Sequence, residues 1–338
     1  NGLTGAGVIR IQTDVSACGT LSTAGDTYIL TQNIAAPGDG ACINITANSI
    51  TLNCVNYTIS YASAAANLGI GIDNAGYTGT TIQNCHINGG AGAGPAIFFR
   101  SANSGTIYNN TIITTVADSA GIVLSHSINN SIYQNNITVT GAGSNAIVLN
   151  GTSTGNSVIN LNASAGGFAI NDTASGTNTI SFDNEFGQLN VTSTNLTVTS
   201  TNLVIDTQVF LSSNRTGLLG SFDLQQLNKS ATIKLKGLNA FSYTATPQLL
   251  KDRVRCDYAG GPCTVTSWLA ANGILTATIN SFSNYTTLEA DPPTVSNFKP
   301  INGSNFSSQE DIRFNASVTD GTAVSTVFFM FNNYSKPY

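Results

Sequence analysis

The most regular feature of the chain is a short apolar pattern that returns about every 25 residues. One row of isoleucines falls at Ile72, Ile97, Ile122, Ile147 and Ile170, and a second apolar row at Ile82, Ile107, Ile132, Val158 and Ile180. The segments around both rows are short, β-branched and bounded by Gly, Asn and Ser, which is typical of strands and turns. Two rows that share one period predict a β-solenoid of stacked coils, each with two or three short parallel strands.

Other repeat architectures fit the sequence less well. Helical repeats need long amphipathic runs rich in Glu and Lys, but no Glu precedes Glu185 and no Lys precedes Lys229. Residues 46–205 are therefore predicted to form the solenoid, and residues 1–45 an N-terminal strand and cap, because exposed solenoid ends invite association. Seven coils at about 4.8 Å each would make a rod of roughly 34 Å.

Asparagines also recur in register with the coils. Asn110 and Asn135 each follow the apolar anchor of their coil by three residues, and Cys85 holds the same place one coil earlier. Stacked Asn side chains can hydrogen-bond along a stack of strands. The pattern therefore predicts an internal asparagine ladder.

The periodicity fades after about residue 185, and the alternating run 189–205 predicts last coils or a transition. Strand-like runs and the first lysines then predict a β-sandwich over residues 206–290. Residues 291–338 begin with a Pro-Pro linker and resemble the first half of an immunoglobulin-like module, which normally takes about 100 residues. Either the sequence stops before the true C-terminus or a neighbouring chain completes this partial module by donating a strand. The N-terminal run 7–17 is one candidate donor, and covering the first coil is the alternative role for it.

Six cysteines fit a disulfide framework formed in an oxidising compartment. Cys256 and Cys263 enclose a Gly-Gly-Pro turn and are predicted to pair. The remaining four can pair in three ways, and their wide spacing does not resemble a structural zinc site. We favour Cys18–Cys42 and also Cys54–Cys85, because adjacent coils bring such positions within bonding distance.

These residues also carry a resemblance. The runs CGTLSTAGDTYILTQNI and CINITANSITLNCVNYTI, followed by coils such as TIYNNTI, resemble the right-handed parallel β-helix repeat family. They are most similar to versions in secreted archaeal surface proteins that carry C-terminal sandwich modules, and the resemblance covers roughly residues 15–205. It implies an all-β fold but not one function, since this fold hosts lyases, hydrolases, epimerases, adhesins and structural proteins.

The amino-acid composition limits the classes of partner that this chain is expected to bind. Asn, Thr, Ser and Gly make up nearly half of the 338 residues, charged residues only 9%, and the net charge is −5. Arg10 and Arg100 are the only basic residues before Arg215, which argues against nucleic-acid binding. No apolar run approaches the roughly 18 residues that a membrane span needs. The chain begins at Asn1 without Met or a signal segment, so we expect a processed, secreted protein.

Asn-x-Ser/Thr sequons are in excess. Seventeen occur, against roughly 9 expected by chance from the composition. They predict an extracellular protein with many N-glycans on outward-facing asparagines, although an Asn- and Thr-rich chain also makes sequons by accident. The candidate sites are Asn44, Asn56, Asn109, Asn129, Asn136, Asn150, Asn162, Asn171, Asn190, Asn195, Asn214, Asn228, Asn284, Asn302, Asn305, Asn315 and Asn333.

No catalytic, metal-binding or cofactor-binding motif is predicted. Glycoside hydrolysis needs two carboxyl groups at a defined separation, and only Asp183 and Glu185 come near a pair, since they are two residues apart and are expected on one face of a strand. Arg100, His86 and His126 are expected to be structural or surface residues. The leading hypothesis is a structural cell-surface glycoprotein, a subunit of a filament or surface layer that assembles with itself head to tail. The alternatives are a secreted carbohydrate-active enzyme, lyase or hydrolase, favoured by clustered acids, and a carbohydrate-binding adhesin, favoured by an exposed row that includes Tyr108 and Tyr133.

Overall fold

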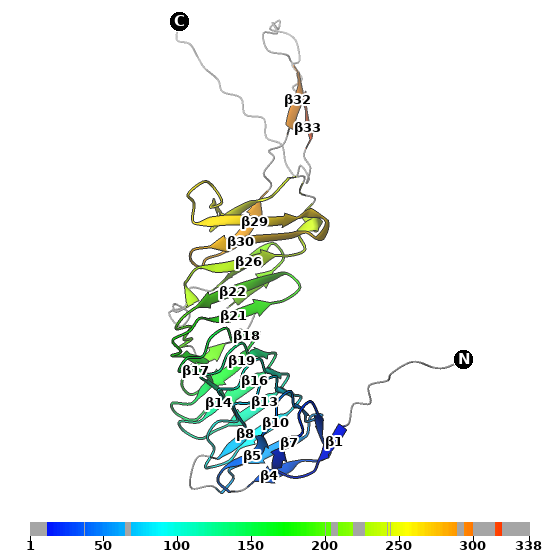
Figure 1. The fold of residues 1–338 in the computed structure, drawn as a ribbon. Helices are drawn as coiled ribbons and strands as arrows, with labels where there is room; N and C mark the ends of the chain where they lie inside the picture. The colour runs from blue at the N-terminus through cyan, green and yellow to red at the C-terminus, as the bar shows by residue number, and fades with distance from the viewer. Residues whose placement is uncertain are drawn as a thin grey trace, which may run out of the picture.

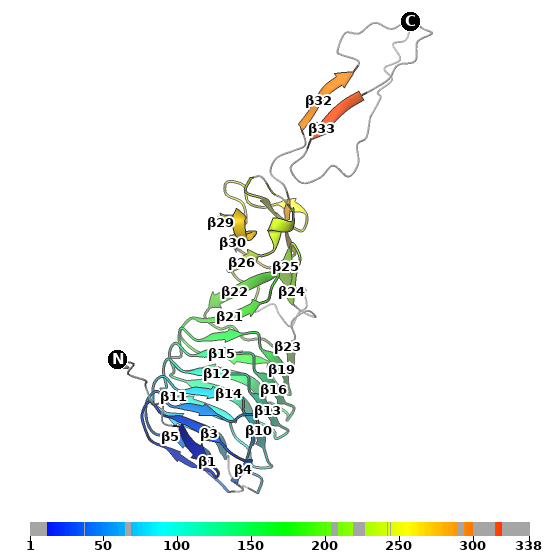
Figure 2. The ribbon, with the colours of Figure 1, turned by 90° about the vertical axis from the view of Figure 1, so that its right-hand side faces the viewer.

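The computed structural model is an elongated, nearly all-β molecule. It describes residues 12–36, 38–64, 69–199, 201–203, 209–218, 227–241, 243, 245–288, 294–299 and 315–319. Stacked coils are followed by antiparallel strands along the same axis (Figures 1 and 2). The predicted right-handed parallel β-helix with about 25 residues per coil is confirmed, with about 6 turns rather than seven.

Three sheets run along the solenoid, and each coil contributes one strand to each. The first sheet has twelve strands, in the order β1 (Gln12–Val15), β3 (Thr27–Leu30), β6 (Thr51–Asn53), β9 (Thr81–Gln83), β12 (Thr106–Tyr108), β15 (Ser131–Tyr133), β18 (Ser157–Ile159), β21 (Asn178–Asp183), β22 (Gly187–Ser193), β26 (Ala231–Leu235), β30 (Ile274–Ile279) and β29 (Cys263–Leu269). The second contains β2 (Gly19–Leu21), β5 (Ala41–Ile45), β8 (Ile70–Ala75), β11 (Ile97–Arg100), β14 (Ala120–Ser125), β17 (Asn145–Asn150) and β20 (Ile170–Asp172). The third contains β23 (Asn202–Leu203), β19 (Asn162–Ala165), β16 (Asn136–Val139), β13 (Thr111–Thr114), β10 (His86–Gly89), β7 (Thr58–Tyr61) and β4 (Ile34–Ala36).

The apolar rows seen in the sequence form the core in register. The row from Ile72 to Ile170 is aligned across the second sheet, and the row from Ile82 to Ile180 across the first. A third row, which the periodicity did not predict, lines the third sheet: Ile59, Ile87, Ile112, Ile137 and Ala163. All three rows are buried. Burying each large aliphatic side chain contributes about 1.5–3 kcal/mol, so coil-on-coil packing is the main source of stability.

The segment predicted as a cap is continuous with the solenoid sheets. β1 pairs in parallel with β3, β2 with β5, and β4 with β7. Residue 45 therefore marks no break in the three sheets. The described part of the candidate donor strand, Gln12–Val15, occupies an edge of its own chain's first sheet.

The predicted asparagine ladder is present at the turn between the first and third sheets. Asn110 and Asn135 are buried, and the Asn110 amide nitrogen Nδ2 donates to Asn135 Oδ1 at 3.0 Å. The backbone N–H of Cys85 donates to Asn110 Oδ1 at 2.9 Å, one coil earlier. Cys85 itself is bonded to Cys54, so a disulfide joins the early coils at this turn and hydrogen bonds continue the column in the next ones.

A second, longer ladder lies at the turn between the second and first sheets. Asn130, Asn156 and Asn178 are buried there, and each Oδ1 accepts the backbone N–H of the residue one coil earlier, at 2.8, 2.9 and 3.1 Å. Serines do the same elsewhere: Ser144 Oγ accepts the N–H of Ser119 at 3.2 Å. A buried N–H without a partner costs about 1–3 kcal/mol, so these side chains supply what the turns lack.

All three predicted disulfides are present. Cys18–Cys42 and Cys54–Cys85 have Cα–Cα separations of 4.7 Å, and Cys256–Cys263 one of 5.4 Å. The first two join coils at the N-terminal end of the rod. The third closes the loop after β28 (Val254–Arg255) in the sandwich.

The chain reverses direction at the end of the solenoid. β22 pairs antiparallel with β21 in the first sheet, Val198 then bridges Ile170 of the second, and β23 pairs antiparallel with β19 of the third. The segment 187–203 therefore retraces one whole coil backwards. The described part of the alternating run 189–205 does form the last coil, but its strands run opposite to those of the earlier coils.

The sandwich grows directly out of the first sheet, because β22, β26, β30 and β29 continue it with antiparallel pairing. Two 3-10 turns lie beside these strands, η2 (Leu238–Phe241) and η3 (Ala270–Asn272). The opposing fourth sheet contains β24 (Val209–Ser212), β25 (Arg215–Leu218), β31 (Tyr285–Leu288), β27 (Gln248–Lys251) and β28. Leu189, Ile233, Leu211 and Tyr285 are buried in the shared core. Farther along, β32 (Thr294–Lys299) and β33 (Asn315–Thr319) form a two-stranded antiparallel ribbon.

Removing one ladder member tests its contribution. Asn156→Ala takes the acceptor from the N–H of Asn130 and the donor from the carbonyl of Ser127. We expect a loss of about 2–4 kcal/mol in unfolding free energy, from urea denaturation followed by circular dichroism with the disulfides intact. The exposed Asn88→Ala, in β10, is the control and should change it by less than about 0.5 kcal/mol. Equal stability of the two variants would contradict a structural role for the ladder.

Candidate glycosylation surface

The sequon asparagines share one property in the structure: none of those it describes is buried. Fourteen of the seventeen fall in described segments, where they are exposed or half-buried; Asn302, Asn305 and Asn333 lie outside them. The half-buried ones are Asn44, Asn150, Asn171, Asn190, Asn214 and Asn284. Oligosaccharide transfer needs access to the side-chain nitrogen, so this distribution suits modification.

The buried asparagines belong to a different set. Among the described residues they are Asn74, Asn110, Asn130, Asn135, Asn156 and Asn178, and no sequon begins at any of them. Neighbouring asparagines are divided between the two roles, because consecutive side chains point in different directions. Asn109 is exposed beside buried Asn110, and Asn129 beside buried Asn130.

Local backbone geometry explains many of the exposed sites. Asn56, Asn109, Asn129, Asn195 and Asn214 all have φ between 50° and 65°, the left-handed region. Asn tolerates this conformation better than most residues, so it occurs at the sharp turns between sheets. The side chains at these turns stand at the corners of the coils, where solvent reaches them.

The sequons are unevenly divided among the faces. Asn44, Asn150 and Asn171 lie in strands of the second sheet, and Asn136 and Asn162 in the third. Across the twelve strands of the first sheet, only Asn190 begins a sequon. One long face of the rod is therefore nearly free of candidate glycan positions.

Some sequon side chains are already held by hydrogen bonds. Asn214 Nδ2 donates to the carbonyl of Thr287 at 3.2 Å, while its Oδ1 accepts the N–H of Thr287 at 2.8 Å. The amide nitrogen of Asn214 is thus used in the fold. In Asn228 the Oδ1 accepts the Phe282 N–H, and its Nδ2 donates to none of the residues that the structure describes. A used amide should be a poorer acceptor of sugar once the chain has folded.

The acidic residues considered for catalysis do not lie together as a pair. β21 ends at Asp183, so Glu185 lies in the following turn and the two do not share a strand face as expected. Asp183 forms an ion pair with Lys236, and Asp73 with Arg100. His86 opens β10 and His126 lies in a turn, both exposed. No group of three or more His, Cys, Asp or Glu side chains that could hold a metal occurs in the described part of the chain.

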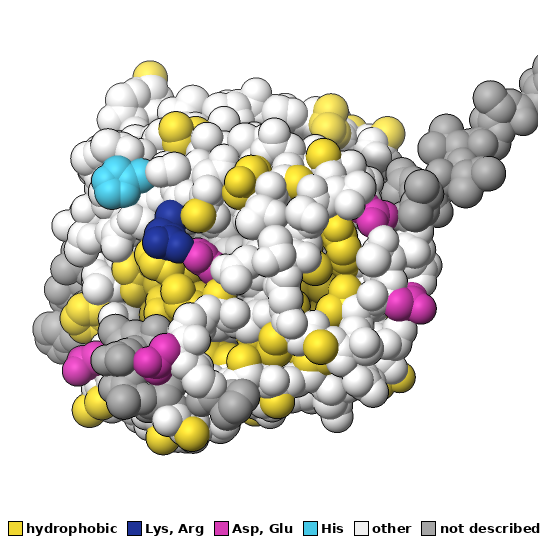
Figure 3. Space-filling model, turned by 60° about the horizontal axis from the view of Figure 1, so that its bottom comes forward, with side chains coloured by type: hydrophobic (Ala, Val, Ile, Leu, Met, Phe, Trp, Pro, Cys, Tyr) yellow, Lys and Arg dark blue, Asp and Glu magenta, His cyan; other side chains and the backbone are white. Residues whose placement is uncertain are grey.

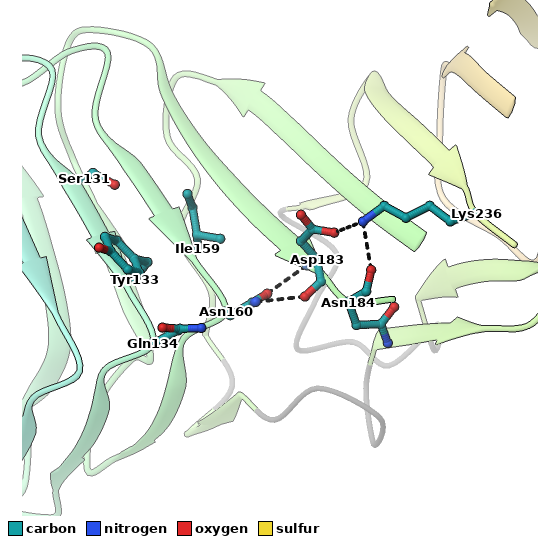
Figure 4. A pocket seen from close by; sticks show the side chains of 8 residues that line it. All are labelled: Ser131, Tyr133, Gln134, Ile159, Asn160, Asp183, Asn184 and Lys236. Carbon is teal, nitrogen blue, oxygen red and sulfur yellow. Dashed lines mark hydrogen bonds and ion pairs between the residues drawn. The ribbon is translucent and has the colours of Figure 1, made fainter. Parts of the chain in front are cut away.

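An open cleft of about 550 Å³ lies where the solenoid meets the sandwich (Figure 4). Tyr133 lines one end of it and stacks on Tyr108, with ring centroids 4.9 Å apart and planes 3° from parallel. On the next strand Ile159 is the register partner of Tyr133, so a smaller side chain follows the two tyrosines along the sheet. At the other end Lys236 contacts Asp183 and donates to the carbonyl of Asn184 at 2.8 Å. Burial, and next the neighbouring Tyr108, raise the pKa of the Tyr133 hydroxyl.

Charged groups are otherwise sparse on the surface of the rod. On the face turned toward its lower end, uncharged polar side chains and backbone dominate and apolar patches lie between them (Figure 3). In the described part of the chain, no helix is long and apolar enough to cross a membrane.

Comparisons with known proteins return nothing similar. No protein-family model, no curated protein and no solved structure matches this chain. The resemblance to archaeal surface proteins therefore stays an expectation, and function has to be argued from the molecule.

Asp172 is the fully buried carboxylate at the end of the long ladder. Its Oδ2 accepts the N–H of Leu196 at 3.1 Å and its Oδ1 that of Ala174 at 3.1 Å, while Asn178 lies within 3.4 Å. Leu196 belongs to the reversed coil, so this carboxylate ties the last two coils together. Burial raises the pKa of Asp172 above its ordinary value, although these hydrogen bonds and Lys229 oppose the shift.

This shift predicts a pH dependence of stability. Because the folded state holds the Asp172 proton more tightly than the unfolded chain, its contribution is fully present below the unfolded pKa of about 3.8 and is lost as the pH rises through the folded value. Asp172→Asn should remove this slope, so its stability relative to the original chain should increase between pH 3 and pH 7. Urea unfolding across that range measures it, with exposed Asp118→Asn as the control. A constant difference at every pH would contradict the assignment.

Proposed function

We propose that this protein is a structural glycoprotein of the cell exterior, a subunit of a surface filament or surface layer built from copies of itself. No catalytic role is part of the proposal. Its similarity to archaeal surface proteins belongs to the same proposal.

The observation that carries it is the division of the asparagines. Every described sequon Asn is accessible, and every buried Asn lies outside a sequon. If sequons were only a by-product of composition, some should fall in the buried ladders and turns, which use six asparagines. Selection for glycan acceptors on the outside and ladder members on the inside accounts for both sets.

Three disulfides and the shape support the same reading. Structural disulfides persist in oxidising compartments outside the cytosol. A stiff rod whose first sheet continues into a sandwich suits a scaffold, because few flexible joints separate its parts. Attached sugars would also provide the solubility that a chain with 9% charged residues otherwise lacks.

Head-to-tail assembly is proposed through the last module. Among the described residues of this module, β32 and β33 pair only with each other, and a two-stranded ribbon alone is marginally stable in water, so the proposal needs further strands to complete a sandwich. A strand from a neighbouring copy is one source of them. The described half of the N-terminal candidate donor is paired with β3 in its own chain, which favours another segment as the donor.

A carbohydrate-binding role is the second candidate, because of one observation. The Tyr108–Tyr133 stack is half-buried on an outer face and leads into the junction cleft, where amides and an ion pair lie beside an aromatic ring. Aromatic rings with a few polar groups are the usual composition of small ligand sites. For the enzyme alternative, the ion pairing of Asp183 and the position of Glu185 leave no comparable support.

Glycopeptide mass spectrometry of native material tests the leading proposal. We expect sugar on most of the fourteen described sequon asparagines, and lower occupancy at Asn214 than at Asn228, because the Asn214 amide nitrogen is engaged. Unmodified peptides throughout would refute the glycoprotein proposal. Electron microscopy of the same material should show ordered fibres or sheets, and separate monomers at all concentrations would refute the assembly.

Loss of the glycans should reduce solubility. Replacing Asn136, Asn162 and Asn315 by Gln in one variant removes three exposed sites that lie in strands, away from the ladders and the left-handed turns. We therefore expect earlier aggregation in light scattering but little change in urea midpoint. A control replaces the exposed non-sequon residues Asn88, Asn239 and Asn272 by Gln. Equal aggregation of the two variants would contradict the role given to the sugars.

A further inference from the structure

The outer face of the first sheet is a long continuous surface with almost no candidate glycan position in its strands. It runs through twelve hydrogen-bonded strands from β1 to β29, and Asn190 is the only residue in them that begins a sequon. Asn109 and Asn129 lie in the turns that border it. Under the proposed function the neighbouring faces carry the glycans, which leaves this surface available for contact, and the inference rests on that proposal.

Its chemistry suits a protein partner. Alternating burial shows that the first and third residues of the short strands point outward, as Thr106 and Tyr108 do in β12. One outward row is made of hydroxyls: Thr27, Thr51, Thr81, Thr106, Ser131 and Ser157. The parallel row contains Asn53, Gln83, the two stacked tyrosines and Ile159. These two rows hold no charged side chain to desolvate, and Tyr is among the residues that dominate protein interfaces.

Charges within the twelve strands sit mainly at the two ends of the face, with opposite signs. Asp14, in β1, is exposed, and Lys234, in β26, points outward at the other end. The third charged residue in these strands, Asp183, is neutralised by Lys236. The face is therefore negative at the solenoid end and positive at the sandwich end.

The strand order places the tyrosines midway between these charges. β1 is the first strand of the sheet and β26 the tenth, so the midpoint falls between the fifth and sixth, which are β12 and β15. Those are the strands of Tyr108 and Tyr133. A two-fold axis that lies in the plane of contact, runs roughly along the strands and crosses the sheet at the tyrosine stack would bring Asp14 of one copy near Lys234 of the other, twice.

We propose that the occupant of this face is a second copy of the chain, packed antiparallel across the first sheet about that axis. The contact is lateral and isologous, so it goes beyond the head-to-tail assembly proposed above and does not require it. Nine strand steps of about 4.8 Å give a length of roughly 43 Å, and a width of about 15 Å then buries roughly 650 Å² per copy. That is near the lower end of specific interfaces.

Asn190 must be unmodified in this arrangement. It lies in β22, the ninth strand, and faces β3 of the other copy under the same axis. Its side chain is half-buried and its Oδ1 accepts the hydroxyl of Ser181, which holds it against the sheet. Glycopeptide mapping should find Asn190 bare in the dimer, and a glycan there in dimeric material would overturn the proposal.

Charge exchange on the full glycosylated chain tests the geometry. Sedimentation equilibrium of the original chain should show a dimer that weakens as salt rises. Asp14→Lys and Lys234→Asp should each weaken it by about tenfold or more, since each places two like-charged pairs in contact, and the double variant should restore it to within about threefold. Asp118→Lys and Arg253→Asp, off this face, are the controls. If both single variants dimerise weakly and the double variant does not regain the original affinity, the proposed pairing of Asp14 with Lys234 is wrong.

A new glycan tests the face itself. Ser157→Asn combined with Ile159→Thr creates an Asn-Val-Thr sequon in β18, and the glycosylated product should be monomeric. Ser157→Gln with Ile159→Thr changes the same positions without a sequon and should still dimerise. A dimer that survives the added sugar, or an original chain that stays monomeric, would overturn the proposal.

The same variants separate this inference from its rivals. Filaments that persist in the monomeric sequon variant support head-to-tail growth and the lateral contact as independent properties. Ordered dimers without filaments would refute the head-to-tail proposal alone. Retention of a soluble polysaccharide by a monomeric original chain, lost in Tyr133→Ala, would assign the face to carbohydrate instead.

Discussion

Backbone hydrogen bonding between coils is the constraint on which the rest of this structure depends. Strands satisfy one another across each sheet, and some turn N–H groups also reach a carbonyl of the next coil, as that of Asn129 reaches Thr154. Other turn N–H groups have a side chain of the next coil as their partner instead. Asn110, Asn130, Asn135 and Asn156 supply these side chains by reaching from one coil to the next. Side chains at one turn must therefore match those in the coils before and after it, even where the coil length varies: the ladder contacts span 25, 26 and 22 residues.

The same residue type serves two opposite environments because position decides its partners. An Asn inside the turn has backbone groups on both sides and is fully bonded, whereas its neighbour in the chain points to solvent. Charged residues are few because neither the buried turns nor the exposed turns require a charged side chain. The amide inside is neutral and bonded, and the outside is proposed to carry sugars. Asp172 is an exception. Its buried carboxyl group joins the reversed coil to the rod, and burial raises its pKa.

Much of this architecture follows from the sequence, for a physical reason. Coils that stack in register repeat their apolar anchors at equal intervals, so the row from Ile72 to Ile170, the Asn110–Asn135 ladder and the disulfides could be placed from the residues alone. The third row, from Ile87 to Ala163, repeats as regularly as the others, but each member follows an anchor of the first sheet by only five residues, so the sequence does not separate the two rows. The reversal at β22 did so because alternation does not reveal strand direction. The junction cleft depends on the sizes of Tyr133 and Ile159 on adjacent strands, and on Lys236 from a distant one, which no local pattern contains. Sequon accessibility was expected, but the bare first sheet emerges only when the strands are assigned to faces.

The reversed coil also determines how long the rod can be. A stack of identical parallel coils has no intrinsic last member, and its open end would accept another coil from any copy, as fibrils do. Here the final coil presents strands of the opposite direction, so the parallel register that each earlier coil offered to the next is no longer available in any of the three sheets. Termination is thus encoded in the direction of the backbone rather than in repulsive side chains. The reversed coil therefore sets the number of parallel coils, and a longer rod would need whole coils inserted before residue 187.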